Sequence, residues 1–138
     1  MRTFPGREDY EQLIYSLPEY FSGMRSSTLK LYTNSPGTCL IRGSLRFDNR
    51  LELQVFEYLD LADRKLLSYS YTILRDGERI RWYDPQPHPE ILELAATFPH
   101  HYHDPPDIKH HRHPAIGISF DAPNLPLLIK VCLDLAGD

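Results

Sequence analysis

Alternation between apolar and polar residues, from residue 27 to residue 84, constrains the fold of this chain more than any other feature. A period of two is that of a β-strand with one buried face. Five such segments follow one another, separated by turn-forming residues: Ser27–Thr33, Thr38–Phe47, Leu51–Leu59, Lys65–Arg75 and Glu78–Tyr83. Asp76-Gly77 favours a tight hairpin, because both central positions of that turn require positive φ. The pattern therefore predicts an antiparallel meander of about five strands.

Two segments outside this region have helical spacing and are expected to cover one face of the sheet. Near the N-terminus, apolar residues predict a helix over about residues 7–17, which Pro18 should end. Near the C-terminus, Asn124 can cap a helix over about residues 124–136 that carries a broad apolar stripe. Because a half-apolar sheet must be packed by other elements, we expect an α+β fold in one domain, residues 1–138.

The composition limits where the protein works and what it binds. With 138 residues the chain fits a single domain with its own core. It has no apolar run near the roughly 20 residues that span a bilayer, and its N-terminus lacks the apolar segment of a signal peptide. We therefore expect no membrane association and a cytoplasmic location. The formal net charge of −4 argues against non-specific binding to a polyanion, but it is compatible with a local basic site.

The strongest functional signal is a Pro/His-rich segment at residues 85–113. All seven histidines lie between His88 and His113, among prolines that favour stiff, extended backbone. Histidine has the side-chain pKa nearest neutrality, so such a cluster suggests proton transfer, metal binding or pH sensing. We expect this segment to form a site at the end of the sheet, beside the arginine-bearing strands.

The first interpretation of the site is acid/base catalysis on a phosphodiester, for which two imidazoles and a cationic group are sufficient. RNA supplies its own nucleophile, the 2′-hydroxyl, so no metal or cofactor is required. We expect His100 and His101 to act as acid and base. Arg81 would donate to the phosphate, while Tyr83 and Asp84 would orient the reacting groups. The residues expected to bind substrate are Arg79, His88, His103, Lys109 and Arg112.

The second interpretation is a non-catalytic site for a metal ion, with zinc as the candidate, or for another ligand. The pairs His101/His103 and His111/His113 each place two imidazoles on one side of an extended backbone. A nearby carboxylate such as Asp84 could complete a tetrahedral set. The segment matches no established zinc motif, and neither cysteine is close to it. The residues alone leave both interpretations open.

A simpler interpretation gives these residues structural roles. The histidines would lie in a solvated loop and bond to backbone groups, although seven in one segment exceed what such a loop needs. The alternate arginines would be charges on the wet face of the sheet: Arg42, Arg46, Arg79 and Arg81. We expect Phe56 and Trp82, with the tyrosines near them, to be core or sheet-face aromatics rather than platforms for base stacking.

Five motifs along the chain, taken in order, resemble those of a known family. They are Ile41-Arg42-Gly43-Ser44-Leu45-Arg46-Phe47, Phe56-Glu57, Tyr69-Ser70-Tyr71, Arg81-Trp82-Tyr83-Asp84 followed by His88, and Thr97-Phe98-Pro99-His100-His101-Tyr102-His103. Together they resemble the TumE-like toxin family of bacterial type II toxin–antitoxin systems. The most specific part is the pairing of Tyr-Asp-x-x-x-His with Phe-Pro-His-His-x-His, and the likeness runs from about Leu29 to Asp104.

The resemblance implies a small toxin with a partner antitoxin, which would silence the site by covering it. It also suggests RNA as the substrate, and an enzyme of this kind would be a ribonuclease. A homodimer is the competing expectation for a partner, because most soluble oligomers pair with themselves. The substrate and the oligomeric state do not follow from the residues.

Overall fold

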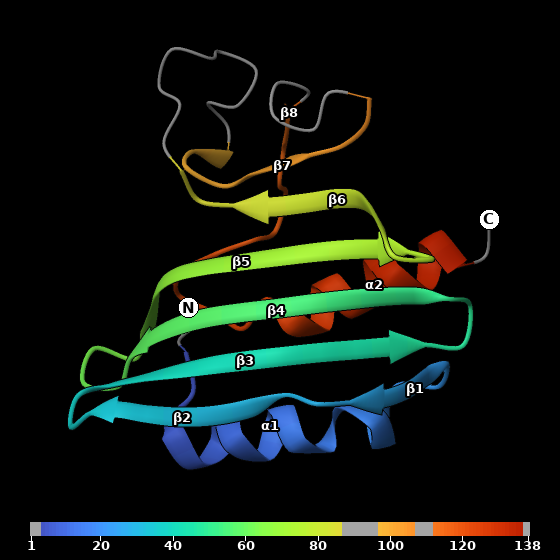
Figure 1. Cartoon of the computed structure of the whole chain (residues 1–138). Coiled ribbons are helices and arrows are strands. Elements are labelled where there is room, and N and C mark those ends of the chain that lie inside the picture. Colours follow the sequence, from blue (N-terminus) through green and yellow to red (C-terminus); the bar gives the residue numbers. More distant parts are fainter. Residues whose placement is uncertain (1–3, 87–96, 107–111, 137–138) are drawn as a thin grey trace.

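The computed structural model describes residues 4–86, 97–106 and 112–136. Over these residues the chain forms one antiparallel sheet and two helices (Figure 1). In chain order the elements are α1 (Arg7–Tyr20), β1 (Met24–Ser27), β2 (Lys30–Ser35), β3 (Thr38–Phe47), β4 (Leu51–Asp60), β5 (Lys65–Arg75), β6 (Glu78–Asp84), β7 (His101–His103), β8 (Arg112–Pro114) and α2 (Leu125–Ala136). The predicted α+β class is confirmed.

The strands lie in the order β1-β3-β4-β5-β6-β7-β8, and β2 pairs with β3 beside β1. The five segments predicted from the alternation are β2 to β6, each paired with the next along the chain, so the predicted meander is confirmed. Asp76 and Gly77 have φ of 52° and 84°, as the tight turn between β5 and β6 requires. The predicted strand number is wrong, because the described residues form eight strands rather than about five.

The additional strands are short, which explains why alternation did not reveal them. β1 and β2 occupy the same edge of β3 and are separated at Thr28 and Leu29. There Thr28 N–H donates to Ser44 O, and Ser44 N–H donates to Thr28 Oγ1, both at 2.9 Å. β7 and β8 are three residues each, too few for a period of two to stand out from the surrounding prolines.

Both helices pack on the same face of the sheet (Figure 1). Alternate residues of the central strands are buried against them: Cys39, Ile41, Leu45, Phe47, Leu51, Leu53, Val55, Leu59, Tyr69, Tyr71 and Ile73. The helices contribute Tyr10, Ile14, Leu17, Leu125, Leu128, Ile129 and Cys132. Neither helix in the described part of the chain is long and apolar enough to cross a membrane.

The helix ends differ in detail from those predicted. α1 continues past Pro18 to Tyr20, because a proline this close to the end removes only the bond that its own nitrogen would donate to the preceding turn. Asn124 precedes α2 as expected, but its side chain is used elsewhere. Its Oδ1 accepts from Ser119 N–H at 2.9 Å, and its Nδ2 donates to Tyr71 OH at 3.2 Å, so the residue ties the start of α2 to β5.

A carboxyl group is buried where α1 meets the sheet. Tyr10 and Tyr71 each donate a hydrogen bond of 2.5 Å to Glu57, one to each carboxylate oxygen. Burial favours the neutral acid and outweighs these hydrogen bonds, so the pKa of Glu57 is raised to about 7. This group therefore ionises near neutral pH inside the core.

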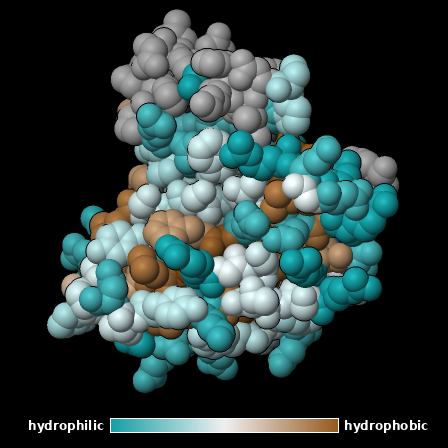
Figure 2. All heavy atoms as spheres, in the orientation of Figure 1, coloured by the Kyte–Doolittle hydropathy of each residue, from teal (hydrophilic) through white to brown (hydrophobic). Residues whose placement is uncertain are grey.

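The opposite face of the sheet, here called the uncovered face, has no helix on it in the described structure. It carries the residues that alternate with the buried ones, such as Arg42, Gln54, Phe56 and Thr72. Figure 2, viewed from this side, shows hydrophilic and hydrophobic groups interspersed rather than one continuous apolar patch. A face of this composition is better suited to binding a polar ligand than to forming part of a buried protein core.

Candidate functional site

Three side chains from β6 and β7 meet on the uncovered face. Asp84 lies opposite His101 across these strands, and Trp82 lies opposite His103. Tyr83 lies opposite Tyr71, whose side chain is buried beneath the helices. Because successive residues of a strand point to opposite sides, Asp84, His101 and His103 project to the other side, the uncovered one. We call these three residues the Asp–His–His cluster.

Their polar atoms converge at hydrogen-bonding distance. His101 Nε2 lies 3.1 Å from Asp84 Oδ1 and 3.1 Å from His103 Nε2. His103 Nε2 lies 3.1 Å from Asp84 Oδ2, and His101 Nδ1 lies 3.1 Å from the carbonyl oxygen of Pro99. Two imidazoles and one carboxylate therefore surround a common point, and a backbone carbonyl fixes the orientation of one ring.

Burial controls the ionisation of the cluster. The residues His101, His103 and Asp84 are 0 %, 4 % and 9 % exposed. Burial alone would raise the pKa of Asp84, but hydrogen bonds from His101 and the Gln86 N–H and the charges of both imidazoles hold that pKa below its ordinary value. Burial also holds the pKa of His103 below its ordinary value, although Asp84 acts in the opposite direction. At neutral pH the carboxyl is thus ionised and His103 is neutral.

Acceptor groups around the cluster fix which nitrogens carry protons. The Pro99 carbonyl can only accept, so His101 carries a proton on Nδ1. The carboxylate of Asp84 also only accepts, so His103 presents Nε2–H to Oδ2. His101 Nε2 lies 3.1 Å from Asp84 Oδ1, so a proton on this nitrogen is donated to the carboxylate, and a metal ion at this position would contact both groups.

Further side chains meet His103 on this face. The indole of Trp82 stacks on the imidazole with ring centroids 5.2 Å apart, and its Nε1–H donates to Ser70 Oγ at 3.1 Å. The guanidinium of Arg79 lies over Trp82, 5.3 Å from the ring centroid. Arg112 lies opposite His103 in β8. Among the described residues, Arg112 Nε and His103 Nδ1 are buried without a hydrogen-bond partner, so a polar ligand here would satisfy both.

Two of the predicted catalytic residues lie on the helix-covered side. Arg81 Nη1 donates to Tyr83 OH at 3.3 Å, and the guanidinium lies 4.5 Å from the centroid of the Tyr102 ring. Tyr83 is buried there. The structure therefore separates Arg81 and Tyr83 from Asp84, although the sequence suggested one catalytic group.

His100 also lies apart from the cluster. Its Nδ1 is 2.6 Å from Tyr69 OH, and its ring packs against Tyr69 and Phe120, with centroids 5.7 Å and 4.6 Å away. Burial at this position lowers its pKa. The structure thus brings His101 together with His103 rather than with His100.

The four histidines expected to hold a metal ion are not all brought together. His113 lies opposite Tyr102, hence on the helix-covered side, where its Nε2 is 3.0 Å from Asp104 Oδ1. His101 and His103 do meet, with Asp84 as the third group. The other predicted site residues lie outside the residues that the structure describes: His88, Lys109 and His111.

Two participants in the site were not predicted for it. Trp82 was expected to be a core or sheet-face aromatic, yet it stands two residues before Asp84. Residues i and i+2 of a strand share a face, so the alternation already carried that signal. No sequence pattern indicated the Pro99 carbonyl, because the position of a backbone group depends only on the path of the chain.

Comparison with known proteins agrees with the motif order noted in the sequence. A family model described as Toxin TumE matches residues 13–134. The chain belongs to the TumE toxin family. No curated protein and no solved structure matched the chain. The TumE match includes β6, β7 and all of the Asp–His–His cluster, and membership of a toxin family implies an antitoxin as partner.

The donor set of this TumE-family cluster fits two kinds of chemistry. An imidazole beside a carboxylate can accept and release a proton. The same three donors also suit a zinc ion, since three protein ligands with remaining positions open are typical of catalytic zinc sites. In that case the hydrogen bond from His101 Nδ1 to Pro99 is the outer contact that orients a metal-bound imidazole.

Proposed function

We propose that this TumE-family chain is a toxin that cleaves RNA, with the Asp–His–His cluster as its acid/base centre. The observation that supports this is the convergence of His101, His103 and Asp84 at 3.1 Å. An imidazole held against a carboxylate in this way can take up and release a proton. The proposal centres the acid/base chemistry on His101 with His103 and Asp84, in place of the expected pair His100 and His101.

The proposed reaction is a transfer of the phosphodiester to the neighbouring 2′-oxygen. His101 Nε2 takes the proton of the 2′-hydroxyl, whose oxygen forms a bond to phosphorus. The bond from phosphorus to the 5′-oxygen breaks, that leaving oxygen takes a proton from water, and the imidazolium of His101 returns its proton to the solvent, while His103 Nε2–H stays on Asp84 Oδ2. Asp84 stabilises the imidazolium that forms on His101, while Arg112 and Arg79 offer positive charge to the phosphate. No metal or cofactor takes part in this scheme.

With RNA as the substrate, the proposed activity takes place in the cytoplasm, and the antitoxin acts by blocking access to the site. An antitoxin bound to the uncovered face near β6 and β7 would keep RNA from the cluster. The formal charge of −4 on the chain would suit a partner with a basic patch. A homodimer is the alternative partner, and light scattering of the purified protein separates the two assemblies.

Cleavage of RNA in excess EDTA tests the proposal. The purified protein should degrade messenger RNA, and replacing either His101 or His103 with alanine should lower the rate at least about a hundredfold. Lys130→Gln, on the exposed side of α2, is the control for contaminating nuclease and should cleave as fast as the natural protein. Equal cleavage by all four proteins would place the activity outside the cluster.

Zinc binding by the same three residues is the second candidate, favoured by their ligand atoms, which all lie within 4.8 Å of one another. Asp84, His101 and His103 would hold the ion, which would supply a Lewis acid and an activated water. A non-catalytic zinc site would instead stabilise the junction of β6 and β7. Either role needs deprotonated imidazoles, so binding weakens at acid pH.

Calorimetric titration with zinc chloride tests this candidate. Zinc should bind and raise the melting temperature by mass action on the folded state. Asp84→Asn and His103→Ala should each weaken binding, whereas His113→Ala should not, because His113 lies on the other side of the sheet. No binding at micromolar zinc removes the candidate, and RNA cleavage that stops in EDTA and returns with zinc would transfer the catalytic role to the ion.

A further inference from the structure

We propose that the uncovered face is a track for single-stranded RNA that leads from Arg42 and Phe56 to the Asp–His–His cluster. This inference rests on the proposed function and names both the form of its substrate and the surface that holds it. The sequence suggested only a wet sheet face with scattered arginines. The register of the strands shows which side chains on that face lie next to one another.

Two rows of paired residues cross the sheet toward the cluster. In the first, Arg42 lies opposite Phe56, and Phe56 lies opposite Ser70. The second row runs through six strands and ends beside the cluster: Ser44, Gln54, Thr72, Trp82, His103 and Arg112. Neighbouring strands are about 4.8 Å apart, so Phe56 on β4 and His103 on β7 are separated by roughly 15 Å. That span suits a ligand longer than one nucleotide.

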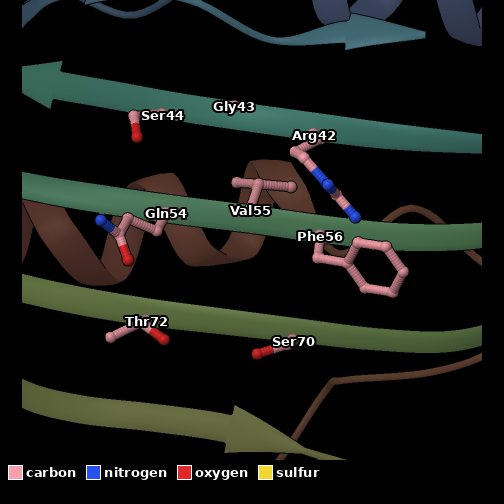
Figure 3. Close-up of a pocket in the computed structure, with 8 residues that line it drawn as sticks. All are labelled: Arg42, Gly43, Ser44, Gln54, Val55, Phe56, Ser70 and Thr72. Carbon is pink, nitrogen blue, oxygen red and sulfur yellow. The ribbon is translucent and has the colours of Figure 1, made fainter. Parts of the chain in front are cut away.

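The far end of the track is a shallow depression of about 330 Å³. Figure 3 shows Arg42 reaching from β3 toward Phe56 on β4, with the polar side chains of Gln54, Ser70 and Thr72 beside them. The guanidinium lies over the ring, 5.3 Å from its centroid. A flat ring and a flat cation at the surface offer stacking to a base and charge to a phosphate.

The near end repeats this arrangement and connects to the cluster. Arg79 lies over Trp82 at 5.3 Å, and Trp82 stacks on His103 at 5.2 Å. The hydrogen bond from Trp82 Nε1 to Ser70 Oγ holds the indole in place between the two ends. A strand of RNA whose phosphate pairs with Arg79 would lie next to His103 and hence to the cluster.

The charges on this face are complementary to a polyanion although the chain as a whole is acidic. Among the described residues Arg42 and Arg79 form no ion pair, whereas Arg46 is paired with Glu52 at 3.3 Å. Lys30 lies opposite Arg42 and adds a further cation at the same end. Unpaired cations at both ends of a polar, aromatic surface can neutralise phosphates and release counterions.

The geometry favours single strands over a duplex. Base pairing hides the faces of the bases, so a base could stack on the Arg42–Phe56 pair only if it is unpaired. The ligand is therefore an unstructured stretch of RNA, with its bases against the sheet.

Binding of a non-cleavable probe tests the track separately from catalysis. The probe is a fluorescein-labelled oligonucleotide of about 12 nucleotides, made of adenosine and uridine with 2′-O-methyl groups, which removes the proposed nucleophile. Anisotropy with the natural protein should show binding. Arg42→Gln combined with Phe56→Leu should weaken it at least about tenfold. Arg42→Gln alone should reduce the slope of log affinity against log salt by about 0.7.

The matched control is Lys130→Gln, which removes one positive charge from α2 on the other side of the sheet. It should bind the probe as the natural protein does, and a duplex of the same sequence should bind more weakly to both. With cleavable RNA, the Arg42→Gln/Phe56→Leu variant should show a raised KM and an unchanged kcat, because these residues lie roughly 15 Å from the cluster.

Each outcome separates the track from the proposed function. RNA cleavage that proceeds with an unchanged KM in the Arg42→Gln/Phe56→Leu variant overturns the track and leaves the function. Probe binding that depends on Arg42 and Phe56 without any cleavage supports the track and removes the function. Loss of antitoxin binding in that variant, with no effect on the probe, would show a surface for protein and overturn the track.

Discussion

At the scale of single residues, the sequence predicted the kinds of side chain in the site but not their grouping. His101-x-His103 indicated two imidazoles on one side of extended backbone, as they are in β7. Their partners depend on how β7 pairs with β6, and a connection from residue 85 to residue 100 carries no information on register. The alternation thus favoured His103 over His100 as the partner of His101, whereas the position of Asp84 opposite His101 could not be predicted.

Glu57 provides the first prediction, because its raised pKa links stability to pH. At low pH the carboxyl is protonated in both states. Between its ordinary value of 4.5 and about 7 only the unfolded chain ionises, so the free energy of unfolding falls as pH rises. Above about pH 7 the loss is complete and amounts to about 3 kcal/mol. Urea unfolding between pH 4 and pH 8 should show this fall.

Glu57→Gln is the comparison that isolates the effect. The variant cannot ionise at this position, so the difference in unfolding free energy between the two proteins should change by about 3 kcal/mol across the range and then level off. A difference that stays constant with pH would mean that Glu57 ionises in the folded protein as it does in water.

At the scale of elements, the alternation predicted the long strands, and its failures have a common cause. β3, β4 and β5 bury about every second residue over 10 or 11 residues, so the signal accumulates. β7 exists because β6 offers an open edge with which it pairs, and β8 pairs in turn with β7, a condition set by tertiary structure. The break between β1 and β2 could not be predicted from the sequence either, because it depends on the close approach of the backbone at Thr28 to Gly43.

Gly43→Ala should destabilise the protein strongly. Gly43 has φ of +150°, and a Cβ there would lie 2.5 Å from the carbonyl oxygen of Thr28, a backbone atom that cannot move alone. We expect a loss on the order of 3 kcal/mol in the free energy of unfolding. Gly37→Ala is the control, because a Cβ at Gly37 has no atom within 4 Å, and it should change stability by less than about 0.5 kcal/mol. Similar midpoints for both variants would contradict the close crossing.

Asn124→Ala should loosen the attachment of α2 to the sheet. The carboxamide is buried and bonds both to Ser119 and to Tyr71, so its removal leaves the half-buried N–H and carbonyl of Ser119 without these partners. A loss of about 2 kcal/mol is expected. Hydrogen exchange should show amides of α2 opening before those of β4. Uniform exchange in the variant would argue that α2 is held by its apolar contacts alone.

At the scale of the whole molecule, the sequence indicated half-buried strands and two helices on one face of the sheet, as in the structure. It did not indicate where each helix lies along that face, because the packing order of helices depends on chain crossings that leave no local pattern. The C-terminal helix buries Leu125, Leu128, Ile129 and Cys132 fully. The case for a partner rests on membership of a toxin family.

Growth of bacterial cells that express the chain gives the whole-molecule prediction. Expression should stop growth, as membership of a toxin family indicates. Co-expression of the product of the adjacent gene should restore growth and yield a heteromeric complex by light scattering. The double variant His101→Ala/His103→Ala should permit growth at equal protein levels. A monodisperse monomer that leaves growth unaffected and captures nothing from the co-expressed gene would contradict both the toxin role and the antitoxin.

β7 pairs with the outer edge of β6 and β8 pairs with β7, so both are added to the sheet last during protein synthesis. A ribosome that has released residues up to Asp84 has already delivered six strands, which are joined by local hairpins and can pair as they emerge. Neither histidine of the cluster has yet been made. A nascent chain therefore acquires six strands of the sheet before it acquires the two imidazoles of the Asp–His–His cluster, and a fragment that ends at that point would lack the proposed acid/base centre.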